Sequence, residues 1–238
     1  GCKPGEGATC SLNTSSGSCV YTTSCLPGYS NIRNSGTATP QCTPITYNIT
    51  YNIIDAIDSS VAVTLDSPLG NTSYTIKQAV TLPTPSATGY TFGGWYTNRS
   101  FTGTAVTSLP VGTTGDKTYY AKMIPEIYYL QYSCNGASGS IPTPASIYYN
   151  RTVTVGENVC THPTATFRGW KLSSSGAVYM PGATFQWTHT GNQVLTAQWS
   201  ECTTCNPGTG ATCSLNASSG SCVYTASCLP GYTNLAGA

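Results

Sequence analysis

Hydrophobic and polar residues alternate in short runs along this chain, and turns rich in Gly, Pro, Ser and Asn separate the runs. The alternation is clearest in the tyrosine-rich stretches 45–54 and 126–134 and in the stretch 191–200. A period of two indicates strands with one buried face, and Tyr and Thr favour strands. We therefore expect a mainly β fold made of several small domains.

The two ends of the chain are copies of one another. Residues 2–35 and 205–238 align without a gap at an offset of 203 residues, and 25 of the 34 aligned positions are identical. Repetition at a fixed period is typical of array proteins. We expect this sequence to be one register of a longer tandem array, slightly more than one repeat long.

The repetition divides the chain into four segments. Residues 1–44 form a Cys-rich module, 45–124 a β-rich domain, 125–200 a second β-rich domain, and 201–238 a partial second copy of the module. The Pro-containing joints between the segments are short. Short joints predict an elongated, semi-rigid array rather than beads on a loose string.

The two β-rich segments share one order of motifs. Each carries an aromatic residue, a Gly-Trp pair, a Pro-containing turn and a closing alternating strand, as in GYTFGGWYT (89–97) and ATFRGWKLS (165–173). Because the Gly-Trp pair occupies an equivalent place in both segments, Trp95 and Trp170 are expected in the core.

These motifs resemble the Listeria–Bacteroides repeat, the internalin B-repeat family, over residues 46–123 and 126–199. The resemblance implies small β-grasp, ubiquitin-like domains of the kind found in tandem on bacterial surface proteins and adhesins. Met123 stands where the family usually has Trp, and Trp199 restores the Trp in the second copy. Cys134 and Cys160 fall near the ends of early strands of that copy, which predicts a disulfide between them.

The other ten of the twelve cysteines lie in the terminal copies. Together the copies define a six-cysteine module, for which fifteen pairings are open. Its expected disulfide cysteines are Cys10, Cys19, Cys25, Cys42, Cys202, Cys205, Cys213, Cys222 and Cys228. In this register of the array, Cys2 and Cys228 are expected to lack the partners that they have in the complete module. The stretch 25–42 resembles the Cys-x-Pro-Gly-Tyr loops of growth-factor-like and ephrin-receptor-like modules.

This cysteine content indicates an oxidising, extracellular compartment. The alternative is a zinc protein that uses the Cys202 and Cys205 pair, but the chain has only two His and no second such pair. Only 7% of residues are charged and the net charge is +1, so no basic surface for nucleic acid is expected. We expect no membrane-spanning segment in this portion.

Residues that could carry chemistry are few. His162 and His189 are interpreted as surface residues, and no nucleophile elbow accompanies them. Asp55 and Asp58 are the only close acid pair, which is too few acids for a calcium loop. We therefore expect no enzyme, no catalytic residue, no metal site and no cofactor.

Aromatic residues offer the only plausible ligand surface. Neighbours in a strand point to opposite faces, so one member of each Tyr-Tyr pair should be exposed. The expected lateral or glycan contacts are Tyr128, Tyr129, Tyr148, Tyr149 and Trp187. Six Asn-x-Ser/Thr sequons are expected glycosylation sites if the host modifies them: Asn13, Asn48, Asn71, Asn98, Asn150 and Asn216.

The interpretation that follows is a non-enzymatic extracellular repeat, a stalk or fibre segment of a large adhesin-like cell-surface protein. Its partners would be neighbouring repeats of the same chain. Two alternatives stay open. In one, identical chains assemble into an extracellular filament through unpaired sheet edges. In the other, the domains bind cell-surface glycans with avidity from repetition.

Overall fold

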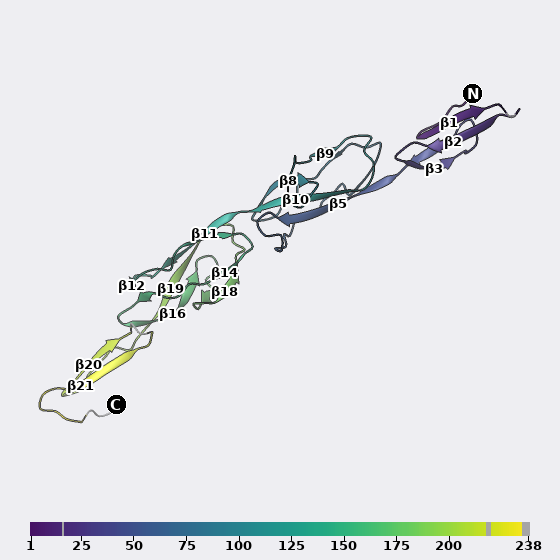
Figure 1. Cartoon of the computed structure of the whole chain (residues 1–238). Coiled ribbons are helices and arrows are strands. Elements are labelled where there is room, and N and C mark those ends of the chain that lie inside the picture. The colour runs from purple at the N-terminus through teal and green to yellow at the C-terminus, as the bar shows by residue number, and fades with distance from the viewer. Residues whose placement is uncertain (16, 218–219, 235–238) are drawn as a thin grey trace. The chain divides into compact units, whose positions relative to one another are not determined.

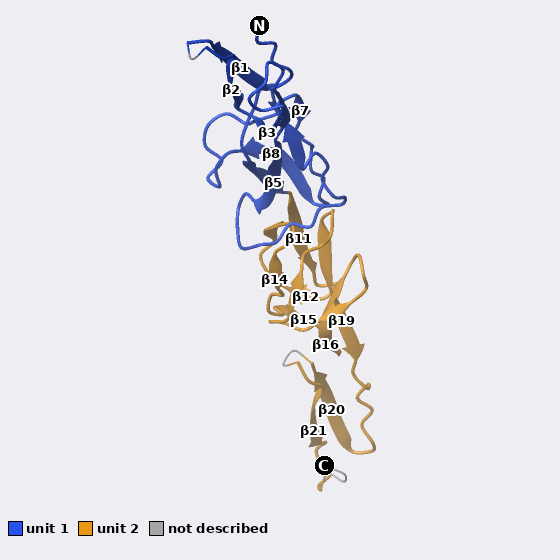
Figure 2. Cartoon of the chain, turned by 90° about the vertical axis from the view of Figure 1, so that its right-hand side faces the viewer, with its two compact units in different colours: residues 1–125 blue, residues 126–238 orange. Residues whose placement is uncertain are grey.

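A computed structural model describes residues 1–15, 17–217 and 220–234. The chain divides into two compact units, residues 1–125 and 126–238, and each is described by itself (Figure 2). Every regular element of the described residues is a β-strand (Figure 1). The mainly β fold expected from the alternating pattern is therefore confirmed.

The first unit opens with the Cys-rich module. Its four strands are β1 (Ala8–Asn13), β2 (Val20–Cys25), β3 (Tyr29–Arg33) and β4 (Gln41–Pro44). Strand β1 pairs with β2 and β3 pairs with β4, both antiparallel. Few apolar side chains of this module are buried, with Ala8, Pro40 and Cys42 the main ones. Two small hairpins without a shared core need covalent staples.

The rest of the first unit is a β domain around a four-stranded sheet. Its strands are β5 (Thr46–Asp55), β6 (Ser73–Thr75), β7 (Val80–Thr81), β8 (Tyr90–Tyr96), β9 (Ser108–Leu109) and β10 (Lys117–Pro125). The sheet has the order β6-β5-β10-β8, and β7 pairs with β9. Strands β5 and β10 run parallel, and the other pairs in the sheet are antiparallel.

The second unit begins with a similar β domain. Its strands are β11 (Ile127–Ser133), β12 (Ser138–Gly139), β13 (Ala145–Tyr148), β14 (Thr152–Thr154), β15 (Cys160–Thr161), β16 (Ala165–Leu172), β17 (Val178–Tyr179), β18 (Thr184–Gln186) and β19 (Gln193–Glu201). The main sheet has the order β13-β11-β19-β16-β17, with β11 and β19 parallel.

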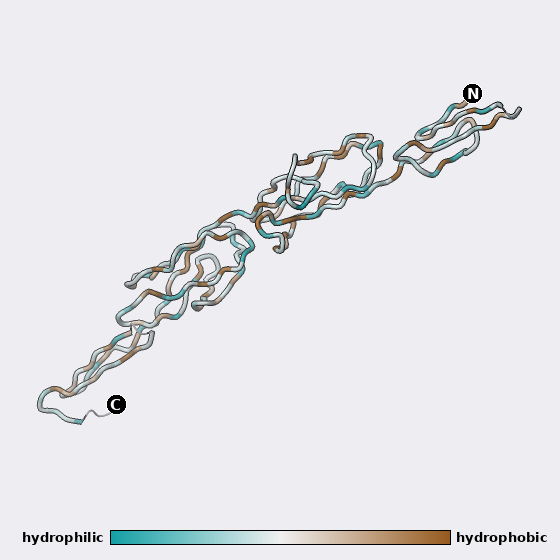
Figure 3. Tube along the Cα trace, in the orientation of Figure 1, coloured by the Kyte–Doolittle hydropathy of each residue, from teal (hydrophilic) through white to brown (hydrophobic). Residues whose placement is uncertain are grey.

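Both sheets place the first and last long strands side by side and parallel at the centre, which is the arrangement of a β-grasp sheet. The helix that usually crosses such a sheet is replaced in both domains by loops and short strand pairs within the described residues. Hydrophobic and hydrophilic positions are interleaved along the strands, as Figure 3 shows. This alternation gives each sheet one face that packs on the core.

The Gly-Trp motif forms a β-bulge in each domain. Gly94 and Gly169 have φ values of 112° and 125°, a region that side chains with a Cβ rarely adopt. The extra residue turns the next side chain into the core, where Trp95 and Trp170 are 2% and 0% exposed. The motif is therefore a packing device, as expected from its equivalent place in both domains.

The second unit ends with the second copy of the Cys-rich hairpin, β20 (Ala211–Asn216) and β21 (Val223–Cys228). Ala211 pairs with Cys228, just as Ala8 pairs with Cys25 in the first copy. The side chains of Thr9 and Ser24 share a 2.7 Å hydrogen bond, and Thr212 and Ser227 repeat it at 2.8 Å. The same sequence therefore folds into the same hairpin twice.

Candidate functional site

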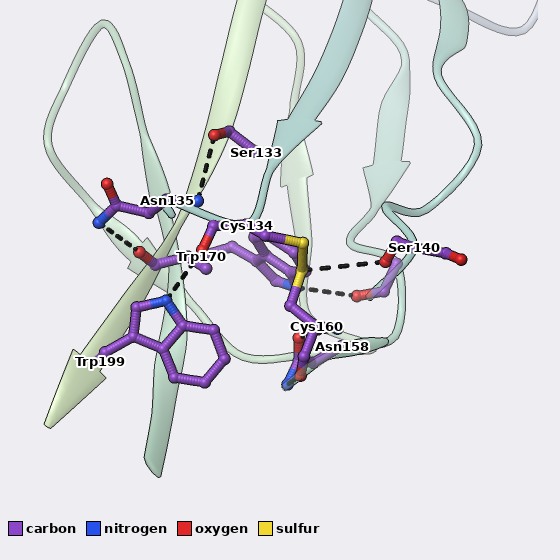
Figure 4. Close-up of a disulfide and its surroundings, with 10 residues drawn as sticks. Ser133, Cys134, Asn135, Ser140, Asn158, Cys160, Trp170 and Trp199 are labelled. Atoms are coloured by element: carbon purple, nitrogen blue, oxygen red, sulfur yellow. Dashed lines mark hydrogen bonds between the residues drawn. A yellow bond between two sulfur atoms is a disulfide. The ribbon is translucent and has the colours of Figure 1, made fainter. Parts of the chain in front are cut away.

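The disulfide of the second β domain staples the loop after the first strand of the sheet (Figure 4). Cys134 and Cys160 are bonded with 5.6 Å between their Cα atoms, which is the pairing that the sequence predicts. The carbonyl of Cys134 accepts a 3.0 Å hydrogen bond from the indole N–H of Trp199, and the amide of Asn135 donates to the carbonyl of Ala197. The staple thus ties β11, β15 and β19 together at one end of the sheet.

Four further disulfides lie in the Cys-rich modules. They join Cys2 to Cys10, Cys25 to Cys42, Cys202 to Cys222, and Cys205 to Cys213. The expectation that Cys2 lacks a partner is wrong, because Cys2 bonds to Cys10. The cysteines left as thiols are Cys19, which was expected in a disulfide, and Cys228. Sequence spacing alone could not have told Cys2 from Cys19.

In the first unit, the Cys-rich module joins the β domain through a direct contact. Only Ile45 separates β4 from β5, and its backbone N–H donates a 2.9 Å hydrogen bond to the carbonyl of Gly28. The side chains of Glu6 and Lys77 form an ion pair at 2.6 Å. The hydrogen bond from Lys77 to Glu6, followed by the charge of Glu6, raises the pKa of that lysine.

The second unit has a comparable joint between its β domain and its Cys-rich module. The backbone N–H of Cys202 donates to the carbonyl of Thr164 at 2.7 Å, and the hydroxyl of Thr164 donates to the carboxylate of Glu201. The hydroxyl of Tyr224 donates to the carbonyl of Thr203 at 2.8 Å. An open hollow of about 610 Å³ lies between the two parts, lined by Ser138, Thr161, His162, Pro163, Ser214, Leu215 and Asn216.

The tyrosine pairs divide between core and surface, as their place in strands predicts. Tyr129 is 53% exposed and Tyr148 is 36% exposed, whereas Tyr149 is half-buried. Ile127 lies opposite Tyr148 in the pairing of β11 with β13, and Tyr129 follows two residues later on the same face. We call this group of Ile127, Tyr129 and Tyr148 the tyrosine face.

Burial removes two residues from the expected contact surface. Tyr128 is 9% exposed, and burial, with a 2.6 Å hydrogen bond to Glu126, raises its pKa to about 12. Trp187 is fully buried, and its indole N–H donates to the carbonyl of His189 at 2.9 Å. Neither side chain can stack on a ligand. No repeated motif marks the position of Trp187, so its burial could not be predicted from the sequence.

The titratable residues singled out in the sequence serve local structure. The Asp55 carboxylate accepts backbone hydrogen bonds from Ile57 and Asp58, both at 2.9 Å, and one from the hydroxyl of Tyr90. His162 packs against Trp199, and His189 shares a 3.3 Å hydrogen bond with Ser174. Within the described residues, no three His, Cys, Asp or Glu side chains form a group that could hold a metal ion.

The sequons differ in how their side chains are placed. Asn13, Asn48, Asn71 and Asn216 are exposed, and Asn98 and Asn150 are half-buried. The Asn98 amide is held in its own turn, where it accepts from Thr102 and donates back to the carbonyl of that residue. Accessibility therefore favours the first four as acceptors of a sugar.

Two disulfide-stapled modules and two β-grasp domains with equivalent bulges define a tandem-repeat β protein. The sequence profile of the Listeria–Bacteroides repeat domain matches residues 47–122 and 128–198, and the chain belongs to this family. Such domains are typical of cell-surface repeat proteins and generally lack catalytic activity. With the five disulfides, they indicate an extracellular location.

Comparisons with characterised proteins and with solved structures return no match. The resemblance of the Cys-rich modules to growth-factor-like and ephrin-receptor-like modules has no support from them and stays a prediction. The described residues include no helix long and apolar enough to cross a membrane.

Proposed function

We propose that the chain is a non-enzymatic structural repeat, a stalk or fibre segment of a large adhesin-like cell-surface protein. The observation that carries this proposal is the joint of the first unit. A single residue links the module to the β domain, and the Glu6–Lys77 ion pair and the Ile45 hydrogen bond brace the two sides. A linker of this length has no slack, so bending must break contacts.

The chemistry of the modules supports the same role. A module with few buried apolar side chains keeps its shape through disulfides, which persist in an oxidising medium. Low charge and many Ser, Thr and Asn residues give a hydrated surface with little electrostatic attraction for other molecules. These properties suit a spacer whose work is to hold other domains at a distance.

Small-angle X-ray scattering of the whole chain tests the proposal. A six-residue Gly/Ser segment inserted between Pro44 and Ile45 should broaden the distribution of interatomic distances, because it frees the module from its domain. The matched control places the same segment at the exposed tip of the β1–β2 hairpin, next to Gly17. If the two insertions give indistinguishable curves, the native joint is already loose and the stalk proposal fails.

The tyrosine face favours a second candidate function, the lateral assembly of identical chains. Its three residues are exposed on adjacent strands, and the chain offers little like-charge repulsion to prevent association. Sedimentation velocity should then show oligomers that the double variant Tyr129→Ser, Tyr148→Ser abolishes. A monomer at every concentration would remove this candidate. Saturable binding of soluble glycans by the native chain, lost in the same variant, would replace it with the glycan-binding alternative.

A further inference from the structure

The two Cys-rich copies share one hairpin but have opposite ends exposed. In the first copy, Leu12 and Thr14 at the hairpin tip are exposed, whereas the equivalent Leu215 is half-buried and Ala217 is 3% exposed. In the second copy, Leu215 and Asn216 line the same hollow as Thr161, His162 and Pro163 of the preceding β domain. The first copy therefore shows the tip without a neighbour.

At the other end of the module the situation is reversed. Gly28 of the first copy is buried, and a Cβ at that position would lie 2.5 Å from the side chain of Ile76 in the following β domain. The equivalent Gly231 is exposed, and within the described residues a Cβ there would meet no atom closer than 4 Å. Tyr232 beside it is 53% exposed. The turn of the second copy is thus exposed where the equivalent turn of the first copy is covered.

The two free thiols, Cys19 and Cys228, lie toward these same two ends of the module. Cys19 is equivalent to Cys222, which is bonded to Cys202 at the end of a β domain. Cys228 is equivalent to Cys25, which is bonded to Cys42 just before a β domain. Each free thiol therefore has an equivalent cysteine in the other copy that is bonded. The bond of that equivalent cysteine indicates which segment should carry the partner of the thiol.

We propose that Cys19 and Cys228 are half-cystines that accept a cysteine from an adjoining copy of this repeat. The complete six-cysteine module then pairs its first cysteine with the fourth, the second with the third, and the fifth with the sixth. Cys19 takes the cysteine that follows the last strand of a preceding β-grasp domain. Cys228 takes the cysteine of a strand that leads into a following one.

Each new bond forms when two thiols lose two electrons and two protons to a small-molecule disulfide, which is reduced to two thiols. The bond closes the module around the end of a β-grasp domain at either side. This inference names the partner of the proposed stalk and so rests on that function, but its disulfide pattern can be tested whether or not the stalk exists.

Two extended chains test the proposal. In the first, the segment Ser-Glu-Cys-Thr-Thr, copied from residues 200–204, replaces Gly1. In the second, the sequence of residues 32–44 follows Asn234 in place of residues 235–238. Both are refolded with oxidised and reduced glutathione, and the disulfides are mapped by mass spectrometry of unreduced peptides.

We expect the added cysteine to be bonded to Cys19 in the first chain and to Cys228 in the second. The thiol count under denaturing conditions should fall from two in the native chain to one in each extended chain. Matched controls carry Ser instead of the added Cys and should keep two thiols. An added cysteine that stays reduced, or that bonds to Cys2, Cys10 or Cys25 instead, would overturn the proposal. Failure of the scattering experiment with intact mapping would reject only the stalk.

Discussion

The two β-grasp domains share a sheet and a buried tryptophan, but they secure the loop after the first strand differently. In the first domain, Ala121 of the last strand pairs with Trp95 on one side and with Ile53 on the other. In the second domain, Ala197 of the last strand pairs with Trp170. Its neighbour on the other side is Cys134, because the preceding residues Ser133 and Thr196 are paired. Ile53 of the first domain therefore occupies the place of Cys134 in the second.

The partner position follows from the tryptophan hydrogen bonds. The indole N–H of Trp95 donates to the carbonyl of Pro83, and that of Trp170 donates to the carbonyl of Gly156. Four residues after each acceptor lie Ala87, which is 5% exposed, and Cys160, which is 4% exposed. One domain thus packs Ile53 and Ala87 in its core where the other places a disulfide.

The first domain uses a carboxylate where it lacks the staple. Asp66 accepts hydrogen bonds from the hydroxyl of Ser86 at 2.6 Å and from the backbone and hydroxyl of Thr88 at 3.0 Å. These bonds hold the loop to the segment that contains Ala87. The two domains thus fix this loop in different ways, one by a covalent bond and the other by hydrogen bonds.

The largest expected effect comes from the feature that the domains share. Trp95→Ala and Trp170→Ala each remove a buried indole and should cost about 3–5 kcal/mol of unfolding free energy in their own domain. Urea unfolding followed by hydrogen exchange and mass spectrometry assigns the loss to one domain. Tyr129→Ala, on an exposed face, is the matched control and should cost at most about 0.5 kcal/mol. Equal costs for the three variants would mean that the bulge does not direct a core anchor.

The next largest effect is expected from removing the disulfide that distinguishes the second domain from the first. The double variant Cys134→Ser, Cys160→Ser should lose about 2–4 kcal/mol, because the unfolded loop is no longer constrained and two polar groups enter the core. The variant Cys134→Ile, Cys160→Ala copies the first domain and should be more stable than the serine pair. If it is no better than the serine pair, the two positions are not equivalent.

The reverse exchange introduces a disulfide into the first domain and tests whether the positions are equivalent. Ile53→Cys with Ala87→Cys should form a new disulfide in the first domain and raise its unfolding free energy by up to about 3 kcal/mol. Peptide mapping detects the bond, and reduction of the variant supplies the control. Two persistent thiols at these positions would show that the loop approaches the sheet differently in the two domains.

A smaller effect should appear at alkaline pH in the second domain. Burial raises the pKa of Tyr128 to about 12, above its ordinary value of 10.0. The protonated tyrosine therefore stabilises the domain below pH 10, and this contribution is lost as the pH rises toward about 12. The slope of unfolding free energy against pH should flatten in that window when Tyr128 is changed to Phe. An unchanged slope would place the titration elsewhere.

The smallest expected effect is confined to the first domain in acid. Hydrogen bonds from Ser86 and then Thr88 hold the pKa of Asp66 below its ordinary value of 3.8. The ionised carboxylate thus stabilises the loop above that value, and the contribution is lost as the pH falls through the lower folded pKa. The protection factors for hydrogen exchange in the first domain, corrected for the slower intrinsic exchange in acid, should fall there, and Asp66→Asn should remove this dependence on pH. An equal loss of protection in both domains would rule out this carboxylate as the cause.

Much of the fold could be predicted from the sequence because the signals are local. Alternation of hydrophobic and polar residues predicts the strands, and the repeated Gly-Trp pair marks a position that both domains bury. Which member of the Tyr128–Tyr129 pair faces inward depends on the register of β11 with its neighbours, and alternation alone does not set it. Disulfide pairing also depends on how the strands pack, so spacing alone does not predict that Cys10 bonds to Cys2 and leaves Cys19 as a thiol.

Electron microscopy of the native, unreduced material from its source tests the central claim most directly. A stalk should appear as single thin threads of beads that are tethered at a cell surface and lengthen with the number of repeats. Regular filaments with many chains packed side by side would contradict it and make the chain a filament subunit.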